Sequence, residues 1–225
     1  MDTLEKLRLL GPPTCVEPAE EMAGPHRLPP RPVTDDLAGC IYNAVMPGGR
    51  RIALLKTLLT SACERDCHYC GFRRGRDCPR ASFSADELAR LTVQLHQNGL
   101  IQGVFLSSGV AGGGPRTEDR LIDTAELLRL RHGFQGYIHL KIMPGAEREQ
   151  VVAAMRLANR VSVNLEAPNP DRLAQLSPQK VFFDELLQRL RWIEEIRRSM
   201  PGKWPSSTTQ FVVGPAGESD RELLR

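Results

Sequence analysis

Apolar and polar positions follow two different periods along most of this chain. From residue 50 onward, apolar runs of strand length alternate with segments in which apolar residues recur at helical spacing. Strands are expected over residues 52–59, 103–107, 137–142, 161–166 and 208–213, and helices over residues 84–98, 117–132, 146–159, 182–199 and from 218. Repeated strand–helix units of this length predict a parallel sheet with right-handed crossovers.

The first 48 residues have a different character. They hold eight of the seventeen prolines, which interrupt any periodic pattern after a short helix expected over residues 2–10. We therefore expect two parts. Residues 1–48 form a proline-rich N-terminal arm with one short helix, and residues 49–225 form the core of alternating strands and helices.

Two of the expected strands carry polar side chains at alternate positions. Ser162, Asn164 and Glu166 share one face of their strand, and His139 and Lys141 share one face of theirs. A dry core lined by such side chains would be costly, so we expect an interior that holds a polar ligand. In α/β barrels the chemistry gathers in loops at the carboxyl ends of the strands, and the unusual segments of this chain follow its strands.

Three cysteines lie close together directly after the first expected strand. Cys63, Cys67 and Cys70 have the spacing C-x3-C-x2-C. Thiolates select zinc, copper(I) or iron–sulfur clusters, and a 4Fe-4S cluster ordinarily takes four cysteines, so three would leave one iron open to a small chelating ligand. A zinc site completed by His68 or Cys78 is the alternative, although structural zinc ligands usually come as two separated pairs.

The amino-acid composition indicates the class of protein but not its substrate. With 225 residues, 41% of them hydrophobic, the chain can bury the core of one globular domain. Its net charge of +3 is too small by itself to indicate a nucleic-acid partner. The first residues lack the basic and apolar regions of a signal peptide, and no apolar stretch reaches the ~18 residues of a membrane span. Six cysteines in 225 residues without a signal peptide fit a reducing compartment, so we expect a cytoplasmic protein without a membrane partner.

The cysteine spacing, with Tyr69 directly before the last cysteine, resembles the motif of the radical S-adenosylmethionine (SAM) enzymes. The resemblance extends from about residue 53 to the end of the chain. It implies a 4Fe-4S cluster held by Cys63, Cys67 and Cys70, with S-adenosylmethionine on the open iron. It also implies an electron donor such as flavodoxin or ferredoxin, and an α/β fold with a partial (β/α) barrel of the radical SAM type, here truncated before the sixth strand.

The same resemblance assigns residues around the cosubstrate. Tyr69 stands where the family has an aromatic residue near the adenine. Ser107, Ser108 and Gly109 take the place of the family's Gly-Gly-Glu segment, whose backbone receives the methionine amino group, but this chain lacks the glutamate.

Two later strands complete this set. Asn164 and Glu166 resemble the polar residues of the fourth strand that contact the ribose or the methionine end, with a capped strand end as the alternative. Val212 and Gly214 resemble the adenine segment of the fifth strand, with Gln210 in place of its first glycine. The resemblance assigns no catalytic residue.

Longer strings resemble one group within the family, the radical SAM proteins whose genes accompany a uracil-DNA glycosylase. These strings are residues 105–109, 136–146, 163–169 and 209–214. The resemblance implies a hydrogen-abstracting enzyme of DNA modification or repair, with DNA and a glycosylase-like protein as partners. The helix-hairpin-helix segment of that group is absent here. A non-catalytic, zinc- or cluster-stabilised binding module that acts as a repair adaptor is the competing hypothesis.

Two further groups leave alternatives open. The remaining cysteines, Cys15, Cys40 and Cys78, are dispersed and are interpreted as structural thiols rather than as ligands of a second cluster. Beside the cysteine motif lies a group of four arginines: Arg73, Arg74, Arg76 and Arg80. They could meet the phosphates of a nucleic acid or form a solvated loop face.

Overall fold

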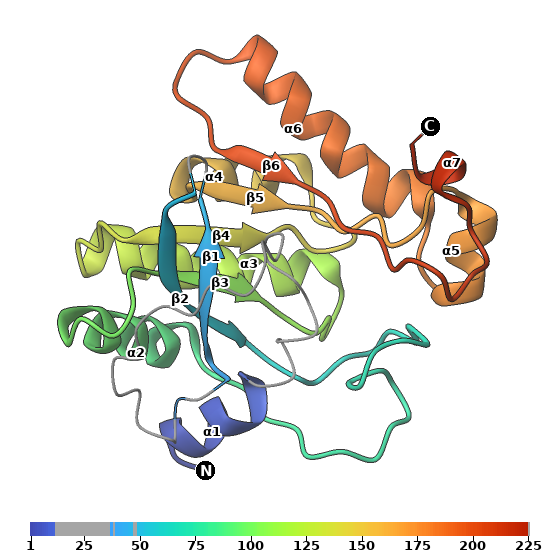
Figure 1. The fold of residues 1–225 in the computed structure, drawn as a ribbon. Helices are drawn as coiled ribbons and strands as arrows, with labels where there is room; N and C mark the ends of the chain where they lie inside the picture. Colours follow the sequence, from blue (N-terminus) through green and yellow to red (C-terminus); the bar gives the residue numbers. More distant parts are fainter. Residues whose placement is uncertain (12–36, 38, 47–48, 225) are drawn as a thin grey trace.

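The computed structural model describes residues 1–11, 37, 39–46 and 49–224, and it contains a six-stranded sheet (Figure 1). The strands lie side by side in chain order: β1 (Ile41–Val45), β2 (Arg51–Leu58), β3 (Gly103–Ser107), β4 (Tyr137–Lys141), β5 (Arg160–Ser162) and β6 (Ser206–Thr208). β1 runs antiparallel to β2, and all later pairs are parallel. The five expected parallel strands are therefore confirmed, whereas β1 lies in a stretch where the prolines favoured irregular structure. Cys15 and residues 12–36 lie outside the described residues.

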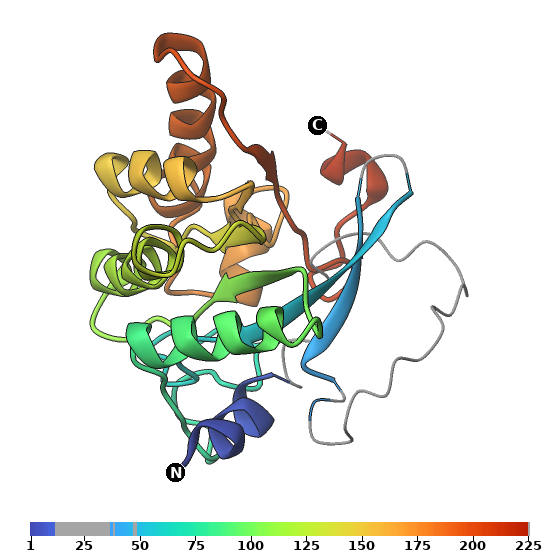
Figure 2. The same ribbon diagram turned by 90° about the vertical axis from the view of Figure 1, so that its left-hand side faces the viewer.

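Helices cover one face of the sheet, as Figure 2 shows. They are α2 (Ala85–Gln97), α3 (Gly114–Glu126), α4 (Arg148–Leu157) and α6 (Gln188–Ser199). α2 begins where expected, because the Ser84 hydroxyl accepts a hydrogen bond from the Glu87 amide at 3.1 Å, and the leucines on one side of this helix are buried. π-helical turns follow α3 (η3, Leu127–Arg131) and precede α6 (η4, Phe182–Leu187).

Three shorter helices lie outside this layer. α1 (Thr3–Leu10) confirms the expected N-terminal helix, with Asp2 as its N-cap. α7 (Asp220–Leu223) occupies part of the last expected helix. α5 (Pro170–Leu176) lies between the strand expected over residues 161–166 and the helix expected over residues 182–199, where no element was expected. Asn169 caps it and Pro170 occupies its first turn, where a proline costs no hydrogen bond.

The last two strands are shorter than their apolar runs predict. β5 ends at Ser162, four residues before Glu166, which has φ 65° in the left-handed region. Glu166 still forms an isolated parallel bridge with Phe211 beyond the end of β6. A non-glycine residue with this φ is strained, and such strain gathers at functional sites. The apolar pattern gave no sign of it.

The face of the sheet opposite the helices is here called the inner face. Lys56, Phe105 and His139 are in register on neighbouring strands and lie on it, because the residues that precede them in sequence pack toward the helices. Toward β1 the inner face is apolar, with Ala44, Ile52 and Leu54 buried together. No helix within the described part of the chain is long and apolar enough to cross a membrane.

Candidate functional site

The cysteine loop, residues 60–80, leaves the carboxyl end of β2 and docks against the loop that follows β3. Glu64 makes the main contact. Its carboxylate accepts hydrogen bonds from the amides of Gly112 and Gly113, each at 3.1 Å, and its own amide donates to the Val110 carbonyl at 2.8 Å. The backbone amides of Gly112 and Gly113 thus point toward an anion, as they do in anion-binding loops. Here the anion is the carboxylate of Glu64 itself.

Residues 107–109 lie directly against the start of the cysteine loop. A Cβ on Gly109 would come within 2.5 Å of the Ala62 carbonyl oxygen, so only glycine fits there. The Gly109 amide donates to the Thr60 carbonyl at 2.8 Å, and the Ser108 hydroxyl donates to the Gly109 carbonyl at 2.8 Å. The buried Ser107 hydroxyl has no hydrogen-bond partner among the described residues.

Arg80 closes the cysteine loop on itself. Its guanidinium donates to the carbonyl oxygens of Ser61 at 2.6 Å, Phe72 at 2.7 Å, Arg73 at 3.1 Å and Arg76 at 3.2 Å. Of the four arginines in this loop, Arg80 therefore has a structural role, because its donors are used by the backbone.

The segment that joins α5 to η4 crosses the other side of the cysteine loop. This segment, residues 175–185, is here called the clasp segment. Arg65 forms an ion pair with Glu185 at 2.6 Å, with both side chains mostly buried. Cys67 Sγ lies 3.2 Å from Ser177 Oγ. The cysteine loop is thus held between the loop that follows β3 and the clasp segment, which comes after β5 in the chain.

Lys180 of the clasp segment links the end of β5 to the cysteine loop. Its Nζ lies 2.8 Å from Glu166 Oε1 and donates to the Tyr69 hydroxyl at 3.1 Å, and the Lys180 and Glu166 side chains are each only 7% exposed. Burial raises the pKa of Glu166, but the charges of Lys180 and Lys141 outweigh it and hold the pKa below its usual value. Burial lowers the pKa of Lys180, but Glu166 outweighs it and the net shift is upward. Both groups are therefore ionised.

The three thiols of the motif are free and lie near one another. Cys67 is buried, and Cys63 and Cys70 are half-buried. Burial raises the pKa of the Cys70 thiol, and Cys67 and Cys63 raise it further through their negative charge. Among the described residues, no group of three or more His, Cys, Asp or Glu side chains is arranged to hold a metal ion. His68, a zinc ligand in the alternative, places its Nδ1 2.9 Å from the backbone carbonyl of Gln175 instead.

The other expected cosubstrate residues lie along the extensions of β5 and β6. The Val212 amide donates to the Glu166 carbonyl at 2.8 Å, which brings these two segments together. Asn164 is half-buried between β5 and Glu166. Gly214 is exposed with φ 103°, and its amide donates to the carboxylate of Glu218. Asn164, Glu166 and Val212 thus lie on one side of the cysteine loop, and residues 107–109 on the other.

Several residues of this site carry no motif that the sequence could reveal. Lys180, Glu185, Arg65 and Glu64 act through contacts between segments far apart in the chain. The available signal was that Lys180 is one of only five lysines and stands directly before a helix. That signal identifies an unusual residue but does not identify its partner.

Glu118 of α3 is fully buried beneath the loop that follows β4. Its Oε2 accepts a hydrogen bond from the Met143 amide at 2.8 Å, and its Oε1 has no hydrogen-bond partner among the described residues. Burial raises the pKa of Glu118 to about 8, against the opposing effect of the Met143 amide. The folded protein therefore keeps this carboxyl largely protonated at neutral pH.

The Glu118→Gln variant is expected to lose much of the pH dependence of stability. The folded state binds the proton more tightly than the unfolded chain, so this group's stabilisation is complete below its ordinary pKa and is lost as pH rises toward 8, by up to ~1.4 kcal/mol per pH unit. Glutamine cannot titrate. Urea unfolding at pH 5, 6, 7 and 8 should therefore give a flatter profile than the parent, while Asp123→Asn, an exposed change on the same helix, should not. An unchanged slope in Glu118→Gln would contradict this assignment.

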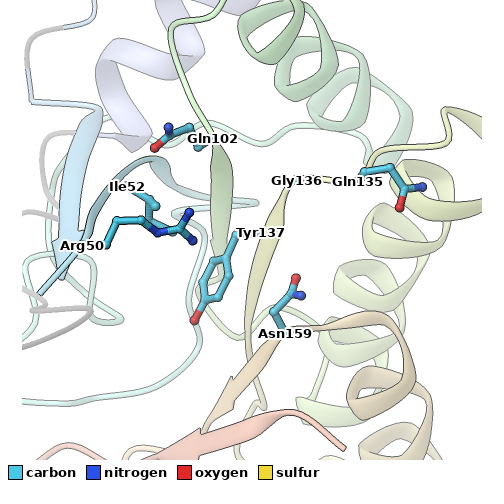
Figure 3. Close-up of a pocket in the computed structure, with 7 residues that line it drawn as sticks. All are labelled: Arg50, Ile52, Gln102, Gln135, Gly136, Tyr137 and Asn159. Carbon is cyan, nitrogen blue, oxygen red and sulfur yellow. The ribbon is translucent and has the colours of Figure 1, made fainter. Parts of the chain in front are cut away.

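A pocket of about 380 Å³ lies at the opposite end of the sheet, at the amino ends of β2 to β5 (Figure 3). Its lining consists of Arg50, Ile52, Gln102, Gln135, Gly136, Tyr137 and Asn159. Two of its polar groups already bond the backbone: Gln102 accepts from the Ala53 amide at 3.1 Å, and Asn159 accepts from the Ile138 amide at 2.8 Å. These side chains cap the strands, and the thiols lie at the other end, so the candidate site is at the cysteine loop.

A family model described as the Radical SAM superfamily matches residues 57–225 of this chain. No curated protein matches the chain. The matched residues include the whole cysteine loop, the clasp segment and every strand from β3 to β6.

Solved structures show the same fold. The FeFe-hydrogenase maturase HydG from Carboxydothermus hydrogenoformans is 17% identical with a TM-score of 0.55, and the match covers 71% of this chain and 36% of HydG. Methylornithine synthase (PylB) is 12% identical with a TM-score of 0.53, and the match covers 69% of this chain and 42% of PylB. The chain thus spans about two fifths of the length of these proteins. The expected α/β fold with a partial barrel is confirmed.

Proposed function

The chain belongs to the Radical SAM superfamily, and from that premise we propose that it is an enzyme that reductively cleaves S-adenosylmethionine. Members of this superfamily use a 4Fe-4S cluster and S-adenosylmethionine. Cys63, Cys67 and Cys70 would hold the cluster, which when bound would supply one electron to the sulfonium and so give methionine and a 5'-deoxyadenosyl radical able to abstract hydrogen from a substrate. The observation that carries the proposal is a loop of three free thiols that two other parts of the chain hold in place.

The residues present fit such a cluster in their chemistry. Thiolates are the usual ligands of iron–sulfur clusters, and Cys63, Cys67 and Cys70 are close enough that two of them perturb the third. A cluster spreads its protein ligands over several irons, so its thiols need to surround a volume rather than converge on one ion. The buried Lys180 side chain places a cation beside Cys67.

The neighbouring residues would position the cosubstrate. Residues 107–109 present backbone groups beside the cysteine loop and would receive the methionine amino group. Asn164 would contact the ribose or the methionine end, and Val212 and Gly214 would border the adenine together with Tyr69. The Glu166 carboxylate forms an ion pair with Lys180. We therefore propose that Glu166 positions Lys180, and through it Tyr69, in addition to any direct contact with the cosubstrate.

Anaerobic reconstitution tests this function. With iron, sulfide and a reductant, the protein should become brown, with broad absorbance in the visible blue. When S-adenosylmethionine is added, with flavodoxin or ferredoxin as the electron donor, the protein should release 5'-deoxyadenosine. Mass spectrometry measures this product. A colourless protein that holds stoichiometric zinc and forms no 5'-deoxyadenosine would contradict the proposal and favour the zinc-stabilised adaptor.

We further propose that the substrate belongs to DNA modification or repair in the cytoplasm, with DNA and a uracil-DNA glycosylase-like protein as partners. The strings at residues 105–109, 136–146, 163–169 and 209–214 support this, as do the exposed side chains of Arg74 and Arg76 beside the thiols. Duplex DNA, single-stranded DNA and nucleosides should be compared as stimulants of 5'-deoxyadenosine release. Stimulation by a small molecule or peptide, with none by nucleic acid, would overturn the DNA assignment and leave the radical chemistry standing.

A further inference from the structure

The inner face carries a row of polar and aromatic side chains below the cysteine loop. Lys56 of β2, Phe105 of β3, His139 of β4 and Arg160 of β5 are consecutive register partners across the sheet. Cross-strand partners lie on the same face, and the contacts agree: the Phe105 and His139 rings are 4.5 Å apart between centroids, and Lys56 Nζ lies 5.7 Å from the Phe105 ring centroid. This row is here called the inner row.

The inner row contains a buried histidine that the fold leaves unsatisfied. His139 is 1% exposed, and neither of its ring nitrogens has a hydrogen-bond partner among the described residues. Ser107 follows Phe105 by two residues on β3, toward the cysteine loop. Its hydroxyl is equally buried and also has no hydrogen-bond partner among the described residues. Buried polar groups are almost always paired, and leaving one unpaired is costly, so a ligand that bonds these groups would relieve a cost built into the fold.

Among the described residues, the charged groups that act on His139 are cations. Burial, together with the charges of Arg160, Lys141 and Lys56, lowers the pKa of His139 to about 3. The imidazole is therefore neutral near pH 7 and keeps one N–H donor. The three cations have interactions of their own, yet their combined field at His139 favours negative charge.

We propose that His139, Ser107 and the cations of the inner row bind an oxyanion of the substrate, a phosphate or a carboxylate, within the barrel. The inference rests on the proposed function, because it names the chemical class of the molecule that the same site would hold. A carboxylate or phosphate accepts the N–H and O–H donors of His139 and Ser107. Lys56 and Arg160 of the inner row, and Lys141 on the same face of β4 as His139, supply charge-assisted contacts. If the positions of His139 and Ser107 served only for packing, apolar residues there would make the fold more stable, because each buried polar group without a hydrogen bond lowers its stability.

Thermal unfolding of the reconstituted protein with and without inorganic phosphate or succinate tests the proposal. Ligands that bind the folded state raise Tm, so one of these dianions should raise it by a few degrees at millimolar concentration, and the one that does identifies the source of the oxyanion. Lys56→Met should weaken that binding about tenfold or more, the loss expected for a charge-assisted bond. Lys203→Met, an exposed change, should leave it unaltered.

His139→Phe supplies the sharper test because it separates binding from folding. It keeps a ring beside Phe105 and removes two unpartnered nitrogens, so the variant should unfold no more easily than the parent without ligand and should lose the dianion-dependent rise in Tm. No rise in Tm for the parent with either dianion, or an equal rise in His139→Phe, would overturn the proposal.

Cleavage of S-adenosylmethionine without substrate is measured on the same preparations. Cleavage without anion binding would refute the oxyanion site alone. Anion binding without a cluster or cleavage would refute the proposed function and leave the oxyanion site standing.

Discussion

Replacing any one of Cys63, Cys67 and Cys70 by alanine is expected to abolish bound iron, and with it all cleavage of S-adenosylmethionine. Each thiolate would hold a different iron, and a cluster that ordinarily takes four cysteines cannot be retained by two. Iron content and visible absorbance after anaerobic reconstitution measure the effect. Because these thiols lie in a loop that Glu64, Arg80 and the clasp segment hold independently, the variants should remain folded, which circular dichroism checks.

Cys78→Ala is the matched control. Cys78 lies in the same loop, half-buried, with its thiol 3.7 Å from the Gly71 carbonyl, so it shares the environment of the motif without belonging to it. Cys15→Ala and Cys40→Ala should likewise retain iron. Iron loss in Cys78→Ala would mean that the cluster has a fourth thiolate and that no iron is open to the cosubstrate.

Lys180→Met is expected to lower the free energy of unfolding by about 3–5 kcal/mol, the range for removing one partner of a buried ion pair. The variant leaves the Glu166 carboxylate buried without its cation, at a residue whose backbone is already strained. Urea unfolding followed by circular dichroism measures the change. Arg198→Met breaks a mostly exposed pair with Glu194 and should cost less than ~1 kcal/mol.

The double variant Glu166→Gln with Lys180→Met shows whether the lost stability comes from the unpaired charge of Glu166 or from the lost packing of the Lys180 side chain. If the penalty of Lys180→Met arises from an uncompensated carboxylate, removing that charge should recover much of the lost stability. A double variant as unstable as the sum of the two single variants would contradict the ion-pair explanation and assign the loss to the lysine's packing instead.

The fold could be predicted where one period dominates the local pattern. Gly103–Ser107 was expected with its observed bounds because it is an apolar run between two helical segments. β1 was missed because its partner is the strand after it, and only that pairing makes a strand of a short run beside prolines. α5 was not expected, although Asn169 followed by Pro170 is typical of a helix start.

The candidate site could be predicted only as far as its residues lie within one motif. The spacing of Cys63, Cys67 and Cys70 is local, so the sequence reveals it. The partner of Glu166 is a lysine fourteen residues later, and the partner of Arg65 is a glutamate 120 residues later. Such pairings depend on how α5 and η4 pack, which no single-sequence pattern encodes.

The clasp segment contacts the cysteine loop but lies far from it along the chain, and this has a consequence for the order in which the site forms. Cys67 and Ser177 are 110 residues apart, and Arg65 and Glu185 are 120 apart. Chains are synthesised from the N-terminus, so the three thiols leave the ribosome long before the residues that close over them. Iron delivered to the nascent chain would meet a loop held on one side only. Stable loading of the cluster is therefore expected only after residue 185 has been synthesised and has left the ribosome.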